Sequence, residues 1–212
     1  MSNNRISKSV IRRLPRYYRF LCELEENDVD RVSSGKLAEI MRTTASQVRQ
    51  DLNCFGGFGH QGYGYPVTTL KNEIIKILGL NKNYKAILIG AGHIGTAIAA
   101  GMNFSKMGVE IVGIFDSNNK IFGNTINNIE IKDINTLESF CKENHTDVAF
   151  LCIPKEAAAD TVKRLYNLGI KNFWNFTHYD IVGEYPDAIV ENVHLSDIMM
   201  TLCYCMNEGK NE

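Results

Sequence analysis

Three glycines in the pattern G-x-G-x-x-G, at Gly90, Gly92 and Gly95, are the residues of this 212-residue chain whose spacing most clearly predicts chemistry. They lie between an apolar run, residues 84–89, and a helix-forming run, residues 96–100, which is the context a dinucleotide-binding loop requires. In that role Gly90 permits the tight turn, Gly92 lets a pyrophosphate approach the backbone, and Gly95 lets the helix pack closely on the strand. Free N–H groups at the helix N-terminus attract the phosphate charge.

An acidic residue, Asp116, ends the next predicted strand, residues 109–115, about 20 residues after the third glycine, which is the position expected for a ribose-binding carboxylate. Its oxygens would accept hydrogen bonds from both ribose hydroxyls and repel a 2′-phosphate. No arginine follows in residues 117–119, so the sequence favours NAD(H) over NADP(H). The alternative is another nucleotide, such as coenzyme A, on the same βαβ unit.

The surrounding elements alternate between strands and helices. Buried strands are predicted over residues 147–153 and 170–176, and helices over 137–144 and 156–168. This order predicts an α/β fold, a Rossmann-type doubly wound parallel sheet over residues 81–193. Ligands of such sheets bind at the carboxyl ends of the strands. The expected cofactor-binding residues are therefore Gly90, Ala91, Gly92, His93, Ile94, Gly95, Asp116, Ile153, Pro154, Asn175 and Phe176.

The N-terminal part of the chain, residues 1–80, reads as a separate helical module. Apolar residues at helical spacing predict a helix from Leu14, with Pro15 in its first turn, and an asparagine-to-arginine loop follows over residues 27–31. Ser33 and Ser34 supply the N-cap of a short second helix that ends near residue 41. A capping-box pattern, Thr44-x-x-Gln47, starts a third helix at Ala45. The second and third helices, joined by a short turn at residues 42–43, form a helix-turn-helix; the alternative is a small helical bundle with an ordinary exposed face.

A run of glycines and aromatics, residues 55–66, follows the third helix. It predicts a β-hairpin, and hence a winged helix, with residues 60–62 at the tip; the alternative is a flexible linker. Residues 1–66 carry a net charge of +3 and the remainder −4, which suits a polyanion at the first module but also a solvated basic face. The expected DNA-binding residues lie near the N-terminus, on the third helix and at the tip: Arg12, Arg13, Arg16, Ser46, Gln47, Arg49, Gln50, His60 and Gln61.

The last helical stretch, Leu195 to Met206, is apolar over nearly every inward position and its opposite face carries little charge. Such a helix must be buried, either against a dimer partner, as a helix-turn-helix that reads two half-sites requires, or against its own sheet. No apolar run reaches the length of a membrane span, and the basic N-terminus lacks the apolar core of a secretory signal. Six cysteines without a C-x-x-C pair indicate neither a metal site nor a disulfide framework; they fit small buried side chains in a reducing cytoplasm.

The run Gln47-Val48-Arg49-Gln50-Asp51-Leu52 and the glycine-aromatic pattern after it, followed by the glycine loop and Phe115-Asp116, resembles the Rex family, the redox-sensing transcriptional repressors of bacteria. The resemblance implies a cytoplasmic homodimer without enzymatic activity that binds double-stranded DNA at an inverted-repeat operator when NADH is low. NADH binding would release the DNA. The C-terminal helix, within residues 194–212, would be exchanged between the two subunits.

Several residues depart from the family pattern. Gln50 replaces the usual lysine and Gln61 the usual arginine, so two phosphate or groove contacts are weakened. The family's switch pairs the arginine matched by Arg19 with a tyrosine and an aspartate, whose positions here are Gly101 and His194. The phenylalanine that often follows that aspartate is Leu195 here, so a weaker contact with the nicotinamide is expected. We therefore expect sensing through domain closure with a different strength of coupling.

Three other functions compete with this interpretation. An NAD-dependent oxidoreductase would need a proton donor or base near the nicotinamide, and His93, His178 and His194 form no recognisable catalytic arrangement. A dinucleotide-sensing dimer without DNA affinity is suggested by the glutamines at 50 and 61. A thiol sensor would use Cys203 and Cys205, but residues i and i+2 of a helix point to different faces.

Overall fold

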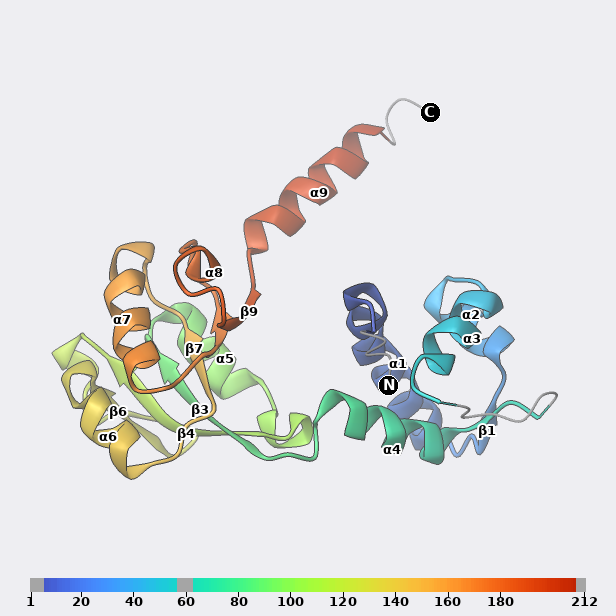
Figure 1. The fold of residues 1–212 in the computed structure, drawn as a ribbon, viewed down its shortest axis with the longest axis horizontal. Helices are drawn as coiled ribbons and strands as arrows, with labels where there is room; N and C mark the ends of the chain where they lie inside the picture. The colour runs from blue at the N-terminus through green and yellow to red at the C-terminus, as the bar shows by residue number, and fades with distance from the viewer. Residues whose placement is uncertain (1–5, 57–62, 209–212) are drawn as a thin grey trace. The chain divides into compact units, whose positions relative to one another are not determined.

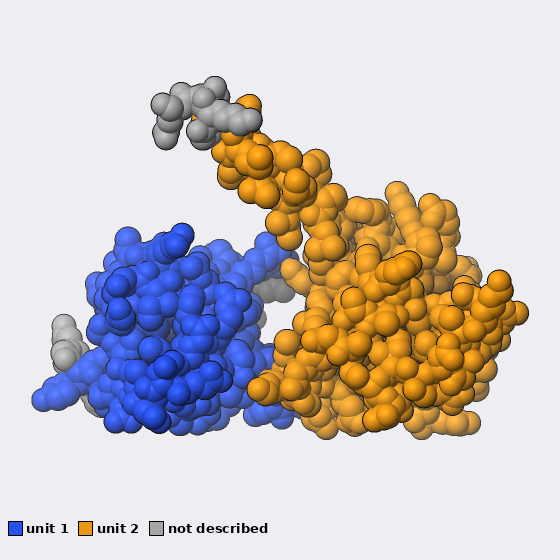
Figure 2. Space-filling model, turned by 180° about the vertical axis from the view of Figure 1, so that it is seen from behind, with its two compact units in different colours: residues 1–82 blue, residues 83–212 orange. Residues whose placement is uncertain are grey.

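The computed structural model describes residues 6–56 and 63–208 and divides the chain into two compact units, residues 1–82 and 83–212 (Figure 2). Each unit has its own hydrophobic core. Within the described part of the chain, no helix is long and apolar enough to cross a membrane.

Unit 1 consists of helices α1 (Lys8–Glu26), α2 (Ser34–Met41), α3 (Ala45–Asn53) and α4 (Val67–Leu78) (Figure 1). The predicted α2 and α3 are confirmed. Their starts are fixed by caps, since Ser33 Oγ accepts the Lys36 N–H at 3.0 Å and Thr44 Oγ1 accepts the Gln47 N–H at 3.1 Å. The start predicted for α1 was wrong: Ser7 caps it, and Pro15 stands inside the helix on its exposed side, where water can satisfy the carbonyl that the proline leaves free.

Most of the predicted hairpin, residues 57–62, lies outside the described residues. Strand β2 (Tyr65–Pro66) pairs antiparallel with β1 (Arg31–Val32), which precedes α2 and lies where a loop was expected. Gly64 makes this approach possible: its φ is +67°, and a Cβ there would stand 2.7 Å from the Val32 carbonyl oxygen. His60 and Gln61 lie outside the described residues.

Unit 2 is the predicted Rossmann-type parallel sheet, with strand order β5-β6-β4-β3-β7-β8-β9; only β5 runs antiparallel to its neighbour. The strands are β3 (Tyr84–Ile89), β4 (Val109–Asp116), β5 (Thr125–Ile126), β6 (Ile129–Asp133), β7 (Val148–Leu151), β8 (Asn172–Asn175) and β9 (Ile189–Asn192). The sequence patterns predicted β3, β4, β7 and β8 and missed the short strands β5, β6 and β9.

Helices cover both faces of the sheet (Figure 1). Because successive side chains of a strand point to opposite faces, each strand contributes residues to the cores on both sides. Ile87 and Ile89 of β3 belong to the core beneath α6 (Leu137–Glu143), α7 (Lys155–Asn167) and α8 (Ile181–Glu184). Ala86 and Leu88 belong to the opposite core, with α5 (His93–Gly101) and the short helix η1 (Phe104–Met107).

Helix α9 (Leu195–Glu208) follows β9, and none of its residues is buried. The alternative that this helix docks on its own sheet was therefore wrong for the single chain. The cysteines also differ from expectation: Cys54, Cys203 and Cys205 are exposed and the other three are half-buried, because they occupy element ends and the faces of helices rather than core positions.

Candidate functional site

The loop between β3 and α5 has the geometry that the glycine pattern predicts. Gly90 has φ +96°, and a Cβ there would stand 2.5 Å from the Cys152 carbonyl oxygen. A Cβ on Gly95 would lie 1.9 Å from the Gly90 carbonyl oxygen. Gly92 differs, because no described atom lies within 4 Å of its would-be Cβ. Packing thus requires the first and third glycines, whereas the second leaves a free surface for a ligand.

Helix α5 begins at this free surface. Gly92 is its N-cap residue, and no described side chain caps the helix, so the N–H groups of the first turn, which includes His93 and Ile94, remain available. Both side chains are exposed. Oriented N–H groups and the helix dipole together favour a bound phosphate. The loop therefore fits the pyrophosphate of a dinucleotide.

Asp116 stands at the carboxyl end of β4 and holds the loop. Its Oδ2 accepts the Ala91 N–H at 2.6 Å and its Oδ1 accepts the Asn118 N–H at 2.8 Å. Each carboxylate oxygen has a second lone pair, so these bonds leave room for ribose hydroxyls. The carboxylate that was predicted to bind the ribose also positions the phosphate-binding loop.

A cavity of about 330 Å³ lies beside the loop and Asp116, within the range of small-molecule sites. Ile153 and Pro154, both predicted, form part of its apolar wall together with Cys152. Burial raises the pKa of the Cys152 thiol to about 12, so this side chain stays neutral and apolar. An apolar wall next to a carboxylate suits the adenosine half of NAD(H).

Of the predicted cofactor residues outside the glycine loop, Asp116, Ile153 and Pro154 line this cavity, whereas Asn175 and Phe176 do not. Asn175 is fully buried, and its side chain binds within the protein: Nδ2 donates to the Tyr179 carbonyl at 3.1 Å and to Asn192 Oδ1 at 2.8 Å, while Oδ1 accepts from Thr177. Phe176 packs against Trp174, with ring centroids 4.7 Å apart. The Asn175 amide thus holds β8, β9 and the following loop together, and its contact with the cofactor stays a prediction.

The sequence analysis missed the contribution of α7. Ala157, Thr161 and Arg164 line the cavity at helical spacing, a signal that was available once Pro154 was placed at the site. Arg164 is not free to bind a 2′-phosphate, because its Nε and Nη2 bind Glu138 at 2.6 and 2.9 Å. The expected preference for NAD(H) over NADP(H) is therefore unchanged by Arg164, which the sequence analysis did not place at the site.

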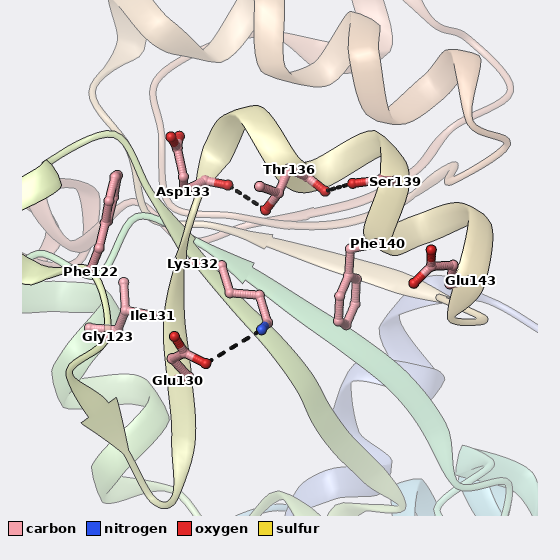
Figure 3. Close-up of a pocket in the computed structure, with 10 residues that line it drawn as sticks. All are labelled: Phe122, Gly123, Glu130, Ile131, Lys132, Asp133, Thr136, Ser139, Phe140 and Glu143. Carbon is pink, nitrogen blue, oxygen red and sulfur yellow. Dashed lines mark hydrogen bonds and ion pairs between the residues drawn. The ribbon is translucent and has the colours of Figure 1, made fainter.

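A second hollow of about 360 Å³ lies between β6 and α6 (Figure 3). Its lining includes neither the glycine loop nor Asp116. Lys132, the basic residue in it, pairs with Glu130 at 3.7 Å. The glycine loop and Asp116 meet instead at the cavity beside Gly92, which is therefore the candidate dinucleotide site.

The candidate nucleic-acid surface of unit 1 is the outer face of α3. Ser46, Arg49 and Gln50 are exposed there, and Arg49 Nη1 donates to Ser34 Oγ at 3.2 Å. On α1, Arg12 and Arg16 are exposed. Helix α3 is the second helix of the helix-turn-helix, and the donors and acceptors in its first turns match those of a recognition helix in the major groove.

Arg13 and Gln47 do not simply face outward. Arg13 Nε and Nη2 each donate to the buried carboxylate of Asp51, both at 2.7 Å. Gln47 Nε2 donates to the same carboxylate at 2.8 Å, so its side chain does not close the capping box, although Thr44 caps α3 as predicted. Tyr17 Oη adds a bond at 3.1 Å. Arg13 therefore fastens α1 to α3, a role that its charge alone did not suggest.

The electrostatics of this cluster keep Asp51 ionised. Burial by itself would raise the pKa of the Asp51 carboxyl, but the hydrogen bonds from Arg13, Gln47 and Tyr17 hold that pKa below its usual range. The hydrogen bonds to Asp51 raise the pKa of Arg13, and burial, together with the charge of Asp51, raises the pKa of Tyr17. The cluster is a buried, paired charge.

The three expected switch residues lie at element ends or on exposed faces. Arg19 is exposed on α1, its guanidinium 5.7 Å from the Phe20 ring centroid. Gly101 ends α5, where an added Cβ would meet open space. His194 precedes α9 and stacks on His178 with ring centroids 4.9 Å apart. Its Nδ1 lies 3.4 Å from the Asp197 carboxylate, and its Nε2 is buried without a partner in the described structure.

None of the described histidines, cysteines and acids form a group that could hold a metal ion.

Comparisons with known proteins agree with this division of the chain. A family model described as "Putative DNA-binding protein N-terminus" matches residues 5–53, and one described as "CoA binding domain" matches residues 81–179. The second model covers the same βαβ unit that the sequence analysis left open to coenzyme A.

Curated relatives match nearly the whole chain. A protein named redox-sensing transcriptional repressor Rex, from Thermoanaerobacter pseudethanolicus, is 53% identical over 204 residues, which cover 96% of this chain and 91% of the relative. A protein of the same name from Clostridioides difficile is 50% identical over 211 residues, 99% of this chain and 100% of the relative.

Solved structures give the same result. The structure of RSP in complex with β-NAD⁺ and operator DNA has a TM-score of 0.90 and 52% identity, covering 97% of this chain and 94% of that one. The structure of RSP in complex with β-NADH has a TM-score of 0.87 and 50% identity, covering 98% and 97%. RSP is described as a Rex-family repressor.

Proposed function

This chain belongs to the Rex family of redox-sensing transcriptional repressors, and on that premise we propose that it binds an inverted-repeat operator as a homodimer and is released by NADH. The observation that carries the proposal is the pairing, in one chain, of a capped helix-turn-helix with a glycine loop whose second glycine faces open space. RSP, which matches over both units, has been solved with operator DNA and NAD⁺ and with NADH.

The residues divide the work between the two units. In unit 2, the α5 N-terminus would hold the pyrophosphate, Asp116 the ribose, and Ile153 with Pro154 the apolar part of the adenosine. In unit 1, α3 would enter the major groove, with the exposed arginines of α1 on the phosphates. The bound nicotinamide serves as a signal, not as a reactant, and the relatives are named as repressors rather than enzymes.

A homodimer is favoured by the exposed surface of unit 2. The apolar residues of α9, including Ile198 and Leu202, are all at least 51% exposed. A groove of about 650 Å³, lined by Phe104, Phe150 and Trp174 among others, lies over β7, β8 and β9. Exposed apolar surfaces of this extent mark interaction sites. We propose that α9 of a second copy covers this groove, and that the dimer acts in the cytoplasm.

The test is fluorescence anisotropy of a labelled inverted-repeat duplex titrated with protein and then with NADH or NAD⁺. We expect binding at low salt and release by NADH alone. A chain that binds NADH and no duplex would instead be a dinucleotide-sensing dimer with another partner. Turnover of NADH with carbonyl substrates would favour the oxidoreductase.

A further inference from the structure

The inner face of α3 carries a charged group that controls one of its outward side chains. Asp51 is completely buried and accepts bonds from Arg13, Tyr17 and Gln47. Gln47 lies one turn earlier on the same helix, in its first turn. A single carboxylate therefore fixes α1 against α3 and holds the amide of a residue near the end of α3 that would meet DNA.

The chemistry of Asp51 decides which end of that amide faces inward. An ionised carboxylate only accepts hydrogen bonds. The NH₂ end of Gln47 must therefore face Asp51, and the reversed amide would place its oxygen against a carboxylate oxygen. Arg13 makes two charge-assisted bonds to Asp51, and these keep the acid ionised.

The other end of the amide consequently lies at the surface. Among the described residues, the one buried side-chain polar atom without a hydrogen-bond partner belongs to His194. Gln47 Oε1 also has no described partner, but it is not one of these buried atoms, so it is accessible to solvent. Gln47 is partly exposed in the first turn of α3, the part of a recognition helix that reaches base edges.

We propose that Gln47 is a specificity-determining residue that reads an exocyclic amine in each operator half-site, and that Asp51 is the positioning residue that fixes its oxygen outward. This inference rests on the proposed function. A glutamine free to turn over presents either a donor or an acceptor. A glutamine held by Asp51 offers its acceptor, so the base must supply a donor. In the major groove those donors are N6 of adenine and N4 of cytosine, whereas guanine O6 and N7 and thymine O4 are acceptors.

The test removes one amine at a time from the operator duplex. Purine replaces adenine and pyrimidin-2-one replaces cytosine, symmetrically in both half-sites, and anisotropy measures the affinity of the full-length protein. We expect one position at which removal weakens wild-type binding about 10-fold or more. The affinities of Gln47→Ala for the intact operator and for the operator that lacks this amine should agree within about twofold. The identity of that base distinguishes adenine from cytosine.

The role of Asp51 has its own readout. Asp51→Asn lets the Gln47 amide turn over, since an amide both donates and accepts. We expect the penalty for the missing amine to fall to about threefold or less, while the NADH affinity of unit 2 is unchanged. Thermal melting verifies that the variant is folded. Asn53→Ala, which removes another exposed amide from α3, is the matched control and should retain the full penalty.

The outcomes separate this inference from the proposed function. Failure of the wild-type protein to bind any duplex at low salt refutes the repressor and the inference with it. Binding without any amine position that depends on Gln47 overturns only the inference. A Gln47-dependent loss of affinity on changing a guanine or a thymine would also overturn it, because contact with an acceptor on those bases requires the amide in the opposite orientation.

Discussion

Alanine substitutions at Gly92 and Gly95 should separate ligand binding from folding within one loop. At Gly92 the backbone has φ −72° and ψ −166°, which any residue adopts, and no described atom lies within 4 Å of the added Cβ. Alanine is a poorer N-cap than glycine but restricts the unfolded chain. These effects oppose each other, so the free energy of unfolding should change by no more than about 0.5 kcal/mol.

The effect of Gly92→Ala on NADH should be large. The methyl group would occupy the surface through which phosphate oxygens approach the N–H groups of α5. Losing two charge-assisted hydrogen bonds, each contributing about 1.5–3 kcal/mol, costs roughly 3–6 kcal/mol. Because 1.4 kcal/mol corresponds to a tenfold change, the dissociation constant should rise at least about 100-fold.

The assay is NADH fluorescence titration together with thermal melting. Gly95→Ala is the contrasting variant: its Cβ would lie 1.9 Å from the Gly90 carbonyl oxygen, so it should lower the free energy of unfolding by about 3 kcal/mol, the upper end of overpacking. A folded Gly92→Ala protein whose NADH affinity stays within threefold of wild type would refute the assignment of the pyrophosphate to this surface.

Four further predictions test other parts of the structure. Asp116→Asn should weaken NADH binding about 10-fold by calorimetry and narrow the preference for NADH over NADPH, because the charge that repels a 2′-phosphate is gone; an unchanged preference would contradict the ribose role. Ile198→Glu should convert a dimer into a monomer in sedimentation velocity and shift the fluorescence of Trp174, whereas a stable dimer would place the interface elsewhere. The folded-state pKa of Asp51 is lowered, so its contribution to stability is present above about pH 4 and lost as the pH falls below it; urea unfolding should show this acid limb in wild type and a flatter one in Asp51→Asn. His194→Asp should change the NADH concentration that releases DNA, and identical release curves would exclude a role for this position in coupling.

The parts of the site that the sequence predicted are those in which local chemistry determines structure. The glycine loop follows directly from its strand and precedes its helix, and Asp116 ends the next strand. Serine and threonine caps set the starts of α2 and α3 through bonds to residues three positions away. Each of these features involves neighbours in the chain, so a pattern of a few residues was sufficient to find it.

The parts that the sequence did not predict depend on distant partners. Strand β2 pairs with Arg31–Val32, which lies before α2, a pairing that the sequence patterns did not predict. Arg13 looks like a phosphate ligand until Asp51, 38 residues away, is brought against it. Asn175 resembles a pocket residue at a strand end, but its amide is consumed by Tyr179, Asn192 and Thr177. A residue type and its position do not reveal which of its bonds the fold has already used.

The proposed homodimer also sets how strongly each NADH site must discriminate. Moving a two-state equilibrium from 1:99 to 99:1 requires about 10⁴-fold preferential binding. Two identical sites multiply their preferences, so each needs only about 100-fold, or roughly 2.7 kcal/mol. Gly101 at the end of α5 and His194 at the start of α9 lie outside the cavity beside Gly92. Their departures from the family pattern should therefore shift the balance between the two states and leave the contacts to the adenosine half of NADH intact.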